Sequence, residues 1–195
     1  MRLLSSLISL LVCVSGVLGQ SSVEKSVCTD KTVGNISSRG IKIGAAIDEV
    51  TKGFDPIRLI RAEKGVGHET VVVFPGQTDL SNGRFKKIRL YNFEFLDGAL
   101  VSYKVVYDGP IWHGMDEYIS RLIESFNLPS MKDWSIDGAR ATLHCQNYEL
   151  AAEFDERSQA SSFEIIDNRL NEIFPARKKK LEDQKRESDI RAFKP

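Results

Sequence analysis

Few residues in this chain have the type and spacing that nucleophilic catalysis needs. Cys145 could form a thiol dyad with His113 or His144. His144 is the neighbour of Cys145 in a segment that alternates apolar and polar residues, so in a strand its side chain points to the opposite face. His113 stays open as a partner, but Cys145 lies on the apolar side and has Cys28 as an oxidation partner. No Gly-x-Ser-x-Gly sequence marks a serine hydrolase.

Metal and carboxylate chemistry have little support either. There is no Cys-x-x-Cys, and no i, i+3 or i, i+4 spacing relates the three histidines, His68, His113 and His144. The acidic pairs Asp48-Glu49 and Asp116-Glu117 are adjacent in predicted helices, where they suit the N-terminal end better than a glycosidase cleft. We therefore predict no catalytic residue, no metal site and no cofactor, and we favour a non-enzymatic protein over an enzyme.

Aromatic side chains are more suggestive of a binding surface. Tyr91, Phe93 and Phe95 share one face of a predicted hairpin, and Trp112 precedes a predicted helix. If helices cover only one side of the sheet, these four side chains could form a contact surface on the other side. The alternative is that they complete the hydrophobic core, and it is favoured because aromatic stripes are more often packed inside.

The first residues have the pattern of a secretory signal peptide. Arg2 precedes an apolar stretch that runs to Leu18, and Gly19 ends a small-residue cleavage site. We predict a signal peptide over residues 1–19, with retention as an uncleaved anchor as the alternative. In an oxidising compartment the remaining cysteines, Cys28 and Cys145, predict one disulfide, with two free thiols as the alternative.

The charge balance bears on the class of partner. The sequence has 27 basic and 27 acidic residues, which gives no support for nucleic-acid binding. After signal cleavage no segment reaches membrane-spanning length, so we predict a secreted or periplasmic protein whose partner is an unknown protein or envelope component. Asn35 opens a glycosylation sequon, which matters only in a eukaryotic secretory host.

The elements that would position these residues are strands and amphipathic helices. Asp97-Gly98 between Phe85–Leu96 and Ala99–Tyr107 predicts a type I′ hairpin in which Leu96 pairs with Ala99 and Phe95 with Leu100. The opposite hairpin face would carry Ile88, Leu90, Val101, Tyr103 and Val105. Short helices are predicted near Ile47 and Met115, and residues 55–69 are predicted to form a loop.

These elements predict an α+β fold: an antiparallel sheet with helices on one face and a C-terminal helical tail. A faint repeat, in which an Asp-Glu pair opens each of the two helices, fits two αβββ units. The expected organisation is a signal peptide (1–19), an N-terminal arm (20–38), an α+β domain (39–166) and a charged helical tail (167–195). Within the domain the two units would span 39–108 and 109–166.

One short segment has a family resemblance. Residues 40–50, Gly-Ile-Lys-Ile-Gly-Ala-Ala-Ile-Asp-Glu-Val, resemble the opening of small bacterial envelope domains, the SmpA/OmlA lipoprotein family and the β-lactamase-inhibitor-like fold. Ala45 and Ala46 stand where those domains have Met and a helix-capping Ser or Thr. The resemblance implies a binding or scaffolding module without enzymatic activity, and as a whole the chain is most similar to exported bacterial proteins. It transfers no partner and no functional residue.

The sequence thus favours a secreted or periplasmic, non-enzymatic binding or interaction domain. Two alternatives stay open. One is a secreted hydrolase of a type without a recognisable motif, and the other is an envelope structural or assembly protein that uses the charged tail.

Overall fold

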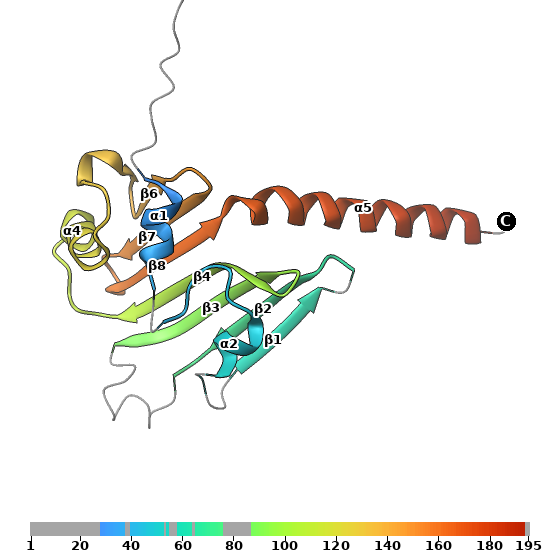
Figure 1. Ribbon diagram of the computed structural model, residues 1–195, viewed down its shortest axis with the longest axis horizontal. Helices are drawn as coiled ribbons and strands as arrows, with labels where there is room; N and C mark the ends of the chain where they lie inside the picture. The colour runs from blue at the N-terminus through green and yellow to red at the C-terminus, as the bar shows by residue number, and fades with distance from the viewer. Residues whose placement is uncertain are drawn as a thin grey trace, which may run out of the picture.

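The computed structural model describes residues 28–37, 40–52, 54, 58–63, 65–75 and 87–193. The predicted signal peptide lies outside these residues, as does the first part of the predicted arm. Figure 1 shows a curved sheet with helices packed against it and one long helix that projects from the body.

The described chain forms one eight-stranded antiparallel sheet in the order β1-β2-β3-β4-β8-β7-β6-β5. Its strands are β1 (Arg58–Glu63), β2 (His68–Val73), β3 (Ile88–Leu96), β4 (Ala99–Asp108), β5 (Ser135–Asp137), β6 (Arg140–His144), β7 (Tyr148–Asp155) and β8 (Ala160–Asp167). The helical elements are α1 (Asp30–Asn35), α2 (Ile47–Lys52), α4 (Met115–Phe126), the 3-10 turn η1 (Met131–Asp133) and α5 (Asn168–Ala192). The predicted α+β class with a C-terminal helix is confirmed.

The sheet has two halves that each follow a short helix. Strands β1–β4 come after α2, strands β5–β8 come after α4, and the last strand of each half pairs with the other, β4 with β8. Each half therefore has four strands where three were predicted. Arg58–Glu63, predicted to lie in a loop, is an edge strand that pairs only with β2 among the described strands. A half-exposed edge does not require an apolar pattern, so it leaves a weak sequence signal.

The predicted β3–β4 hairpin is confirmed. Asp97 and Gly98 have φ angles of 53° and 79°, as a type I′ turn requires. Leu96 pairs with Ala99 and Phe95 with Leu100.

One part of the hairpin prediction is wrong. The register shifts between Glu94 and Phe95, because Glu94 pairs with Ser102 while Phe95 pairs with Leu100, which leaves Val101 as an extra residue. This bulge turns Tyr103 and Val105 onto the face of Phe93, where they are buried, whereas a regular ladder would place them on the other face.

The main core lies between one sheet face and the helices α1, α2 and α4. Val33, Val50 and Ile119 from these helices are at most 2% exposed and belong to the same buried cluster as the inward residues of β2–β4 and β6–β8. A second, smaller cluster lies on the opposite face, where Leu170 of α5 packs with Leu96 and Val101. Helix α5 therefore begins on the sheet face that the other helices leave uncovered.

Candidate interaction surface

Three of the four aromatic residues predicted as a binding surface are core residues. Tyr91, Phe93 and Phe95 are 0%, 1% and 0% exposed. The Phe54 ring lies 5.2 Å from the Tyr91 ring and 5.6 Å from the Phe93 ring, on the helix side of the sheet. The alternative reading, that these residues complete the core, is the one that the structure shows. A surface built on them is excluded because a buried ring has no free face.

The fourth aromatic residue, Trp112, is a half-buried anchor. Its Nε1–H donates to the Ser161 hydroxyl at 3.3 Å, and its backbone N–H donates to Gln159 Oε1 at 3.3 Å. Its ring lies 5.3 Å from the Tyr118 ring. Trp112 thus ties the segment before α4 to strand β8.

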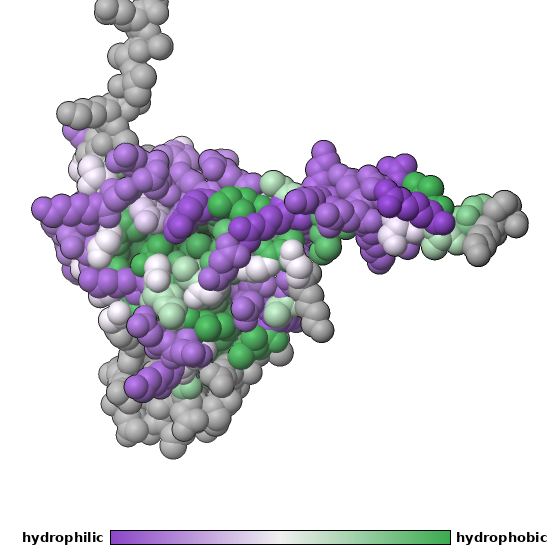
Figure 2. Space-filling model, turned by 45° about the vertical axis from the view of Figure 1, so that its right-hand side comes forward, coloured by the Kyte–Doolittle hydropathy of each residue, from purple (hydrophilic) through white to green (hydrophobic). Residues whose placement is uncertain are grey.

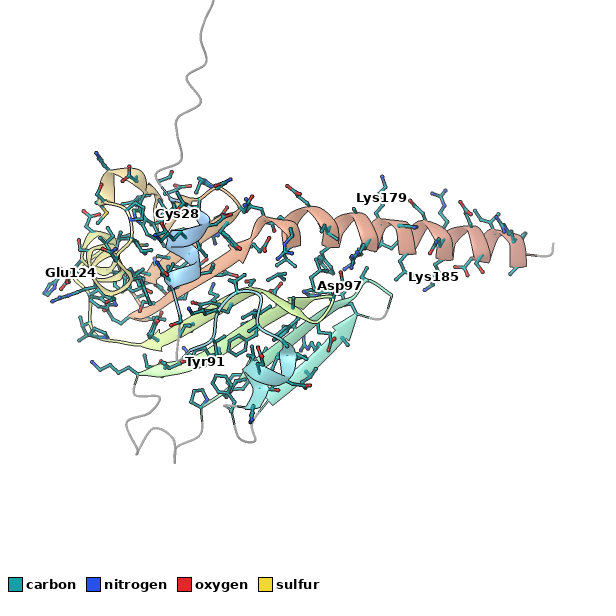
Figure 3. The ribbon with its side chains drawn as sticks, in the orientation of Figure 1. Cys28, Tyr91, Asp97, Glu124, Lys179 and Lys185 are labelled. Carbon is teal, nitrogen blue, oxygen red and sulfur yellow. A yellow bond between two sulfur atoms is a disulfide. The ribbon has the colours of Figure 1, made fainter. Side chains whose placement is uncertain are left out.

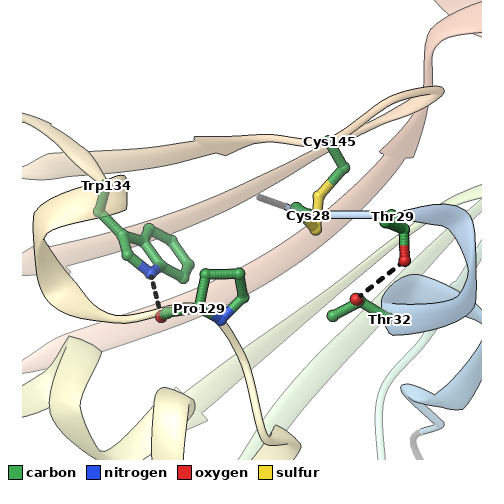
Figure 4. Close-up of a disulfide and its surroundings, with 6 residues drawn as sticks. All are labelled: Cys28, Thr29, Thr32, Pro129, Trp134 and Cys145. Atoms are coloured by element: carbon green, nitrogen blue, oxygen red, sulfur yellow. Dashed lines mark hydrogen bonds between the residues drawn. A yellow bond between two sulfur atoms is a disulfide. The ribbon is translucent and has the colours of Figure 1, made fainter. Parts of the chain in front are cut away.

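The cysteine pair is joined as predicted. Cys28 and Cys145 form a disulfide with a Cα–Cα distance of 4.5 Å, which holds the start of α1 beside the end of β6 (Figure 4). The Thr29 and Thr32 hydroxyls lie 3.4 Å apart in the first turn of α1. Because the bond occupies the Cys145 sulfur, a thiol dyad is not available in this structure.

The histidines and the sequon lie apart from one another. The side chain of His144 is 73% exposed and lies on the sheet face opposite Cys145, as predicted. His113 Nδ1 is 2.9 Å from Glu117 Oε2, and hydrogen bonds from His113 hold the pKa of Glu117 below its usual range. Asn35 is exposed at the end of α1. Within the described ranges no three His, Cys, Asp or Glu side chains are grouped so that they could hold a metal ion.

The feature that sequence reasoning missed is a set of polar side chains on the sheet face opposite the main core. These side chains cross six adjacent strands, from β2 to β6 in sheet order, and we call them the charged ladder. Its members are His68, Asn92, Glu94, Ser102, Lys104, Arg140, His144, Glu149, Glu153, Ser162 and Glu164.

Lys104 is the centre of the ladder. Its Nζ lies 2.6 Å from Glu153 Oε2 and 4.0 Å from Glu164 Oε2. The Ser162 hydroxyl donates to Glu153 Oε2 at 3.2 Å, and the Ser102 hydroxyl donates to Glu164 Oε1 at 3.3 Å. Both carboxylates therefore lie within 4.0 Å of one cation, and each also accepts a hydrogen bond from a buried serine.

Both ends of the ladder continue this pattern. Arg140 donates to Glu153 Oε1 at 2.8 Å and to Glu149 Oε1 at 3.2 Å. On the other half of the sheet, His68 Nε2 lies 3.3 Å from Glu94 Oε2. The ladder thus connects both halves of the sheet across the β4–β8 pair.

The two central carboxyl groups differ in their proton affinity. Burial raises the pKa of Glu164, against the opposing charge of Lys104, while the carboxylates of Glu94 and Glu153 raise it further. The hydrogen bond from Lys104 is the largest of the effects that lower the pKa of Glu153. Two carboxyl groups with opposite pKa shifts can occur in catalytic sites. Here, however, both lie on a sheet face near cations: Glu153 pairs with Lys104 and Arg140, and Glu164 lies 4.0 Å from Lys104.

The ladder is acidic overall. It has four carboxylates, Glu94, Glu149, Glu153 and Glu164, and two permanent cations, Lys104 and Arg140. The side chains of Glu94 and Glu164 are 25% and 17% exposed, so these charges are partly desolvated. This face can therefore attract a cationic group and exclude an anionic one.

Comparison with known proteins adds no relative: no family model, curated protein or solved structure matches this chain. The resemblance to the SmpA/OmlA and β-lactamase-inhibitor-like domains accordingly stays a prediction. Among the described helices, none is long and apolar enough to cross a membrane.

Proposed function

We propose that this chain is an exported, non-enzymatic interaction domain that uses the charged ladder as its contact surface for a cationic protein segment. The observation that carries the proposal is the ladder itself, which spans both halves of the sheet on the face opposite the main core. Partly buried ion pairs rarely repay their desolvation in stability compared with apolar residues. Charges retained in such positions are more readily explained by recognition, since charge complementarity confers specificity and speeds association.

The arrangement of nucleophiles and carboxylates favours binding over hydrolysis. Cys145 is held in the disulfide, and Glu153 is bonded to both Lys104 and Arg140. A glycosidase needs two carboxyl groups that converge across a cleft, with one free to attack or to activate water. The ladder instead presents its charges along a sheet face, an arrangement that suits an extended partner.

The disulfide and the N-terminal sequence pattern support an extracytoplasmic location. A single disulfide between distant cysteines persists in oxidising compartments and is rare in the cytosol. The resemblance of residues 40–50 to envelope domains points to the same compartment and to a scaffolding role.

The test is a binding assay with a defined probe. The chain from Gln20 onward, with the disulfide formed, is titrated with a fluorescent ten-residue lysine-rich peptide and with a glutamate-rich peptide of equal length. We expect binding of the basic peptide alone, weakened at least tenfold when Glu149 and Glu153 are replaced together by Gln. The matched control is Glu124→Gln, an exposed carboxylate that pairs with Arg121 on α4 (Figure 3), the helix that packs on the sheet face opposite the ladder. Equal loss in both variants, or no binding of either peptide, would overturn the proposal.

A further inference from the structure

We infer that the cationic segment that occupies the charged ladder is helix α5 of a second copy of this chain. In the resulting two-fold dimer, each α5 lies across the ladder of its partner. This inference rests on the proposed function and names the partner of the same surface.

The first half of α5 is fixed to its own body. Arg177 makes a two-pronged ion pair with Asp97, at 2.7 and 2.8 Å, and also donates to the Val66 carbonyl at 3.1 Å. Lys178 Nζ lies 3.8 Å from a Glu63 carboxylate oxygen. Leu181 lies against Gly65 at the tip of the β1–β2 turn. The helix is thus held on the hairpin tips up to Leu181.

Beyond Leu181 the helix is unsupported. From Glu182 to Phe193 every residue is exposed, and no hydrogen bond or ion pair joins this half to any other part of the described chain. Figure 1 shows it extending away from the sheet. Isolated helices shorter than about 12–15 residues are marginal in water, and most helical stability in proteins comes from packing. A projecting half of this length is therefore suited to a partner that covers it.

The outer side of α5 has a distinct stripe, which begins at the end of the fixed half and runs along the unsupported half. Lys179, Arg186, Ile190 and Phe193 are spaced at i, i+7, i+11 and i+14, which places them on one side of the helix. Figure 3 shows Lys179 on the side of α5 that points away from the strands. Ile190 and Phe193 are 63% and 76% exposed, and Figure 2 shows apolar surface near the otherwise hydrophilic end of the helix. Asp183, at i+4 from Lys179, lies on the same side, so the stripe combines two cations and one carboxylate with two exposed apolar residues.

The charged ladder complements this stripe in chemistry and length. Its carboxylates offer partners for Lys179 and Arg186, and the half-buried Val72, Leu90 and Val106 on the same sheet face offer apolar contacts for the helix end. The ladder's β2 end is covered by the chain's own α5, because the Phe174 ring lies 4.3 Å from the His68 ring. The stripe is about 21 Å long at 1.5 Å per residue, and the five remaining strands of the ladder span about 19 Å at 4.8 Å per strand. Because each copy has both surfaces, the contact can close by a two-fold axis.

The oligomeric state of the full chain from Gln20 onward tests the inference. Sedimentation equilibrium should give twice the chain mass at roughly 100 μM, with dissociation as salt rises. Replacing Ile190 and Phe193 together by Ser should weaken the dimer at least tenfold. Arg191→Gln, on another side of the same helix, should leave it unchanged. A charge-reversed helix, Lys179→Glu with Arg186→Glu, should be monomeric alone and should pair again with Glu149→Lys, Glu153→Lys protein.

The outcomes separate the two proposals. A monomer at this concentration, or a dimer that the stripe variants leave intact, would overturn the dimer inference. The proposed function would then stand only if the Glu149→Gln, Glu153→Gln protein still lost the basic peptide. If the ladder variants keep both the dimer and the binding of the basic peptide, both proposals are overturned.

Discussion

Removing the disulfide should reduce the stability of this protein by about 4–5 kcal/mol. The bond joins Cys28 to Cys145 across a sequence separation of 117 residues, so it closes a loop that contains most of the sheet. On the chain-entropy model, a loop of this length stabilises the folded state by about 5 kcal/mol through the unfolded chain.

The structure also predicts where the loss appears first. Cys28 connects directly to α1, whose Val33 and the following Ile36 are 2% and 1% exposed in the main core. Without the bond, this segment still has these two apolar contacts, the hydrogen bond that Asn147 donates to Asp30 at 2.7 Å, and the one that the Gln146 backbone N–H donates to the Cys28 carbonyl at 3.3 Å. We therefore expect α1 to open before the sheet unfolds.

The assay is urea unfolding of three samples: oxidised wild type, wild type reduced with dithiothreitol, and Cys28→Ser, Cys145→Ser protein. The last two should agree with each other and should be less stable than the first by about 4–5 kcal/mol. Hydrogen exchange of the α1 amides should accelerate in both. Equal midpoints for all three samples would refute the reasoning, because the loop would then be closed by other contacts in the unfolded state.

Two further predictions concern the ladder and the hairpin. The pKa of Glu164 is raised above 4.5, so stability falls as pH rises from 4.5 through the raised value, and Glu164→Gln should abolish this fall in melting temperature. The pKa of Glu153 is lowered, so stability falls as pH drops from 4.5 through the lowered value, and Glu153→Gln should abolish that separate decline. If both variants keep the wild-type pH profile of the melting temperature, the assignment of these two pH dependences to Glu164 and Glu153 is wrong. Gly98→Ala should cost roughly 1–2 kcal/mol in urea unfolding, because φ is 79° while no atom lies within 4 Å of the added methyl, whereas the helical Gly34→Ala should cost nothing.

Local signals in the sequence were sufficient for the hairpin and for the two short helices. Asp97-Gly98 can supply positive φ angles at two successive positions at little cost, so the turn and the two residue pairs next to it follow from two residues. The Cys28–Cys145 pairing followed from counting the cysteines outside the predicted signal peptide. Each of these inferences needs only residues that are neighbours in the sequence or a count of one residue type.

The bulge and the edge strand could not be predicted in the same way. Val101 is an apolar residue in an apolar strand, and only its packing with Leu170 of α5 identifies it as the extra residue in the pairing of β3 with β4. Strand β1 exists because β2 offers it a pairing edge. Both features depend on contacts between segments far apart in the chain, which a single-sequence pattern does not contain.

The candidate site, too, could be predicted from the sequence only in part. Alternation in β6 placed Arg140 and His144 on one face and Cys145 on the other, so their orientation could be predicted from the sequence. Only the sheet order brings Lys104 of β4 within 4.0 Å of Glu164 on the neighbouring strand β8 and of Glu153 on the next strand, β7. By itself the sequence determined the α+β class, the tight turn and the cysteine pair, because dihedral preferences and side-chain periodicity act over a few residues. The charged ladder was decided by tertiary structure, because strand pairing chooses which distant charges become neighbours.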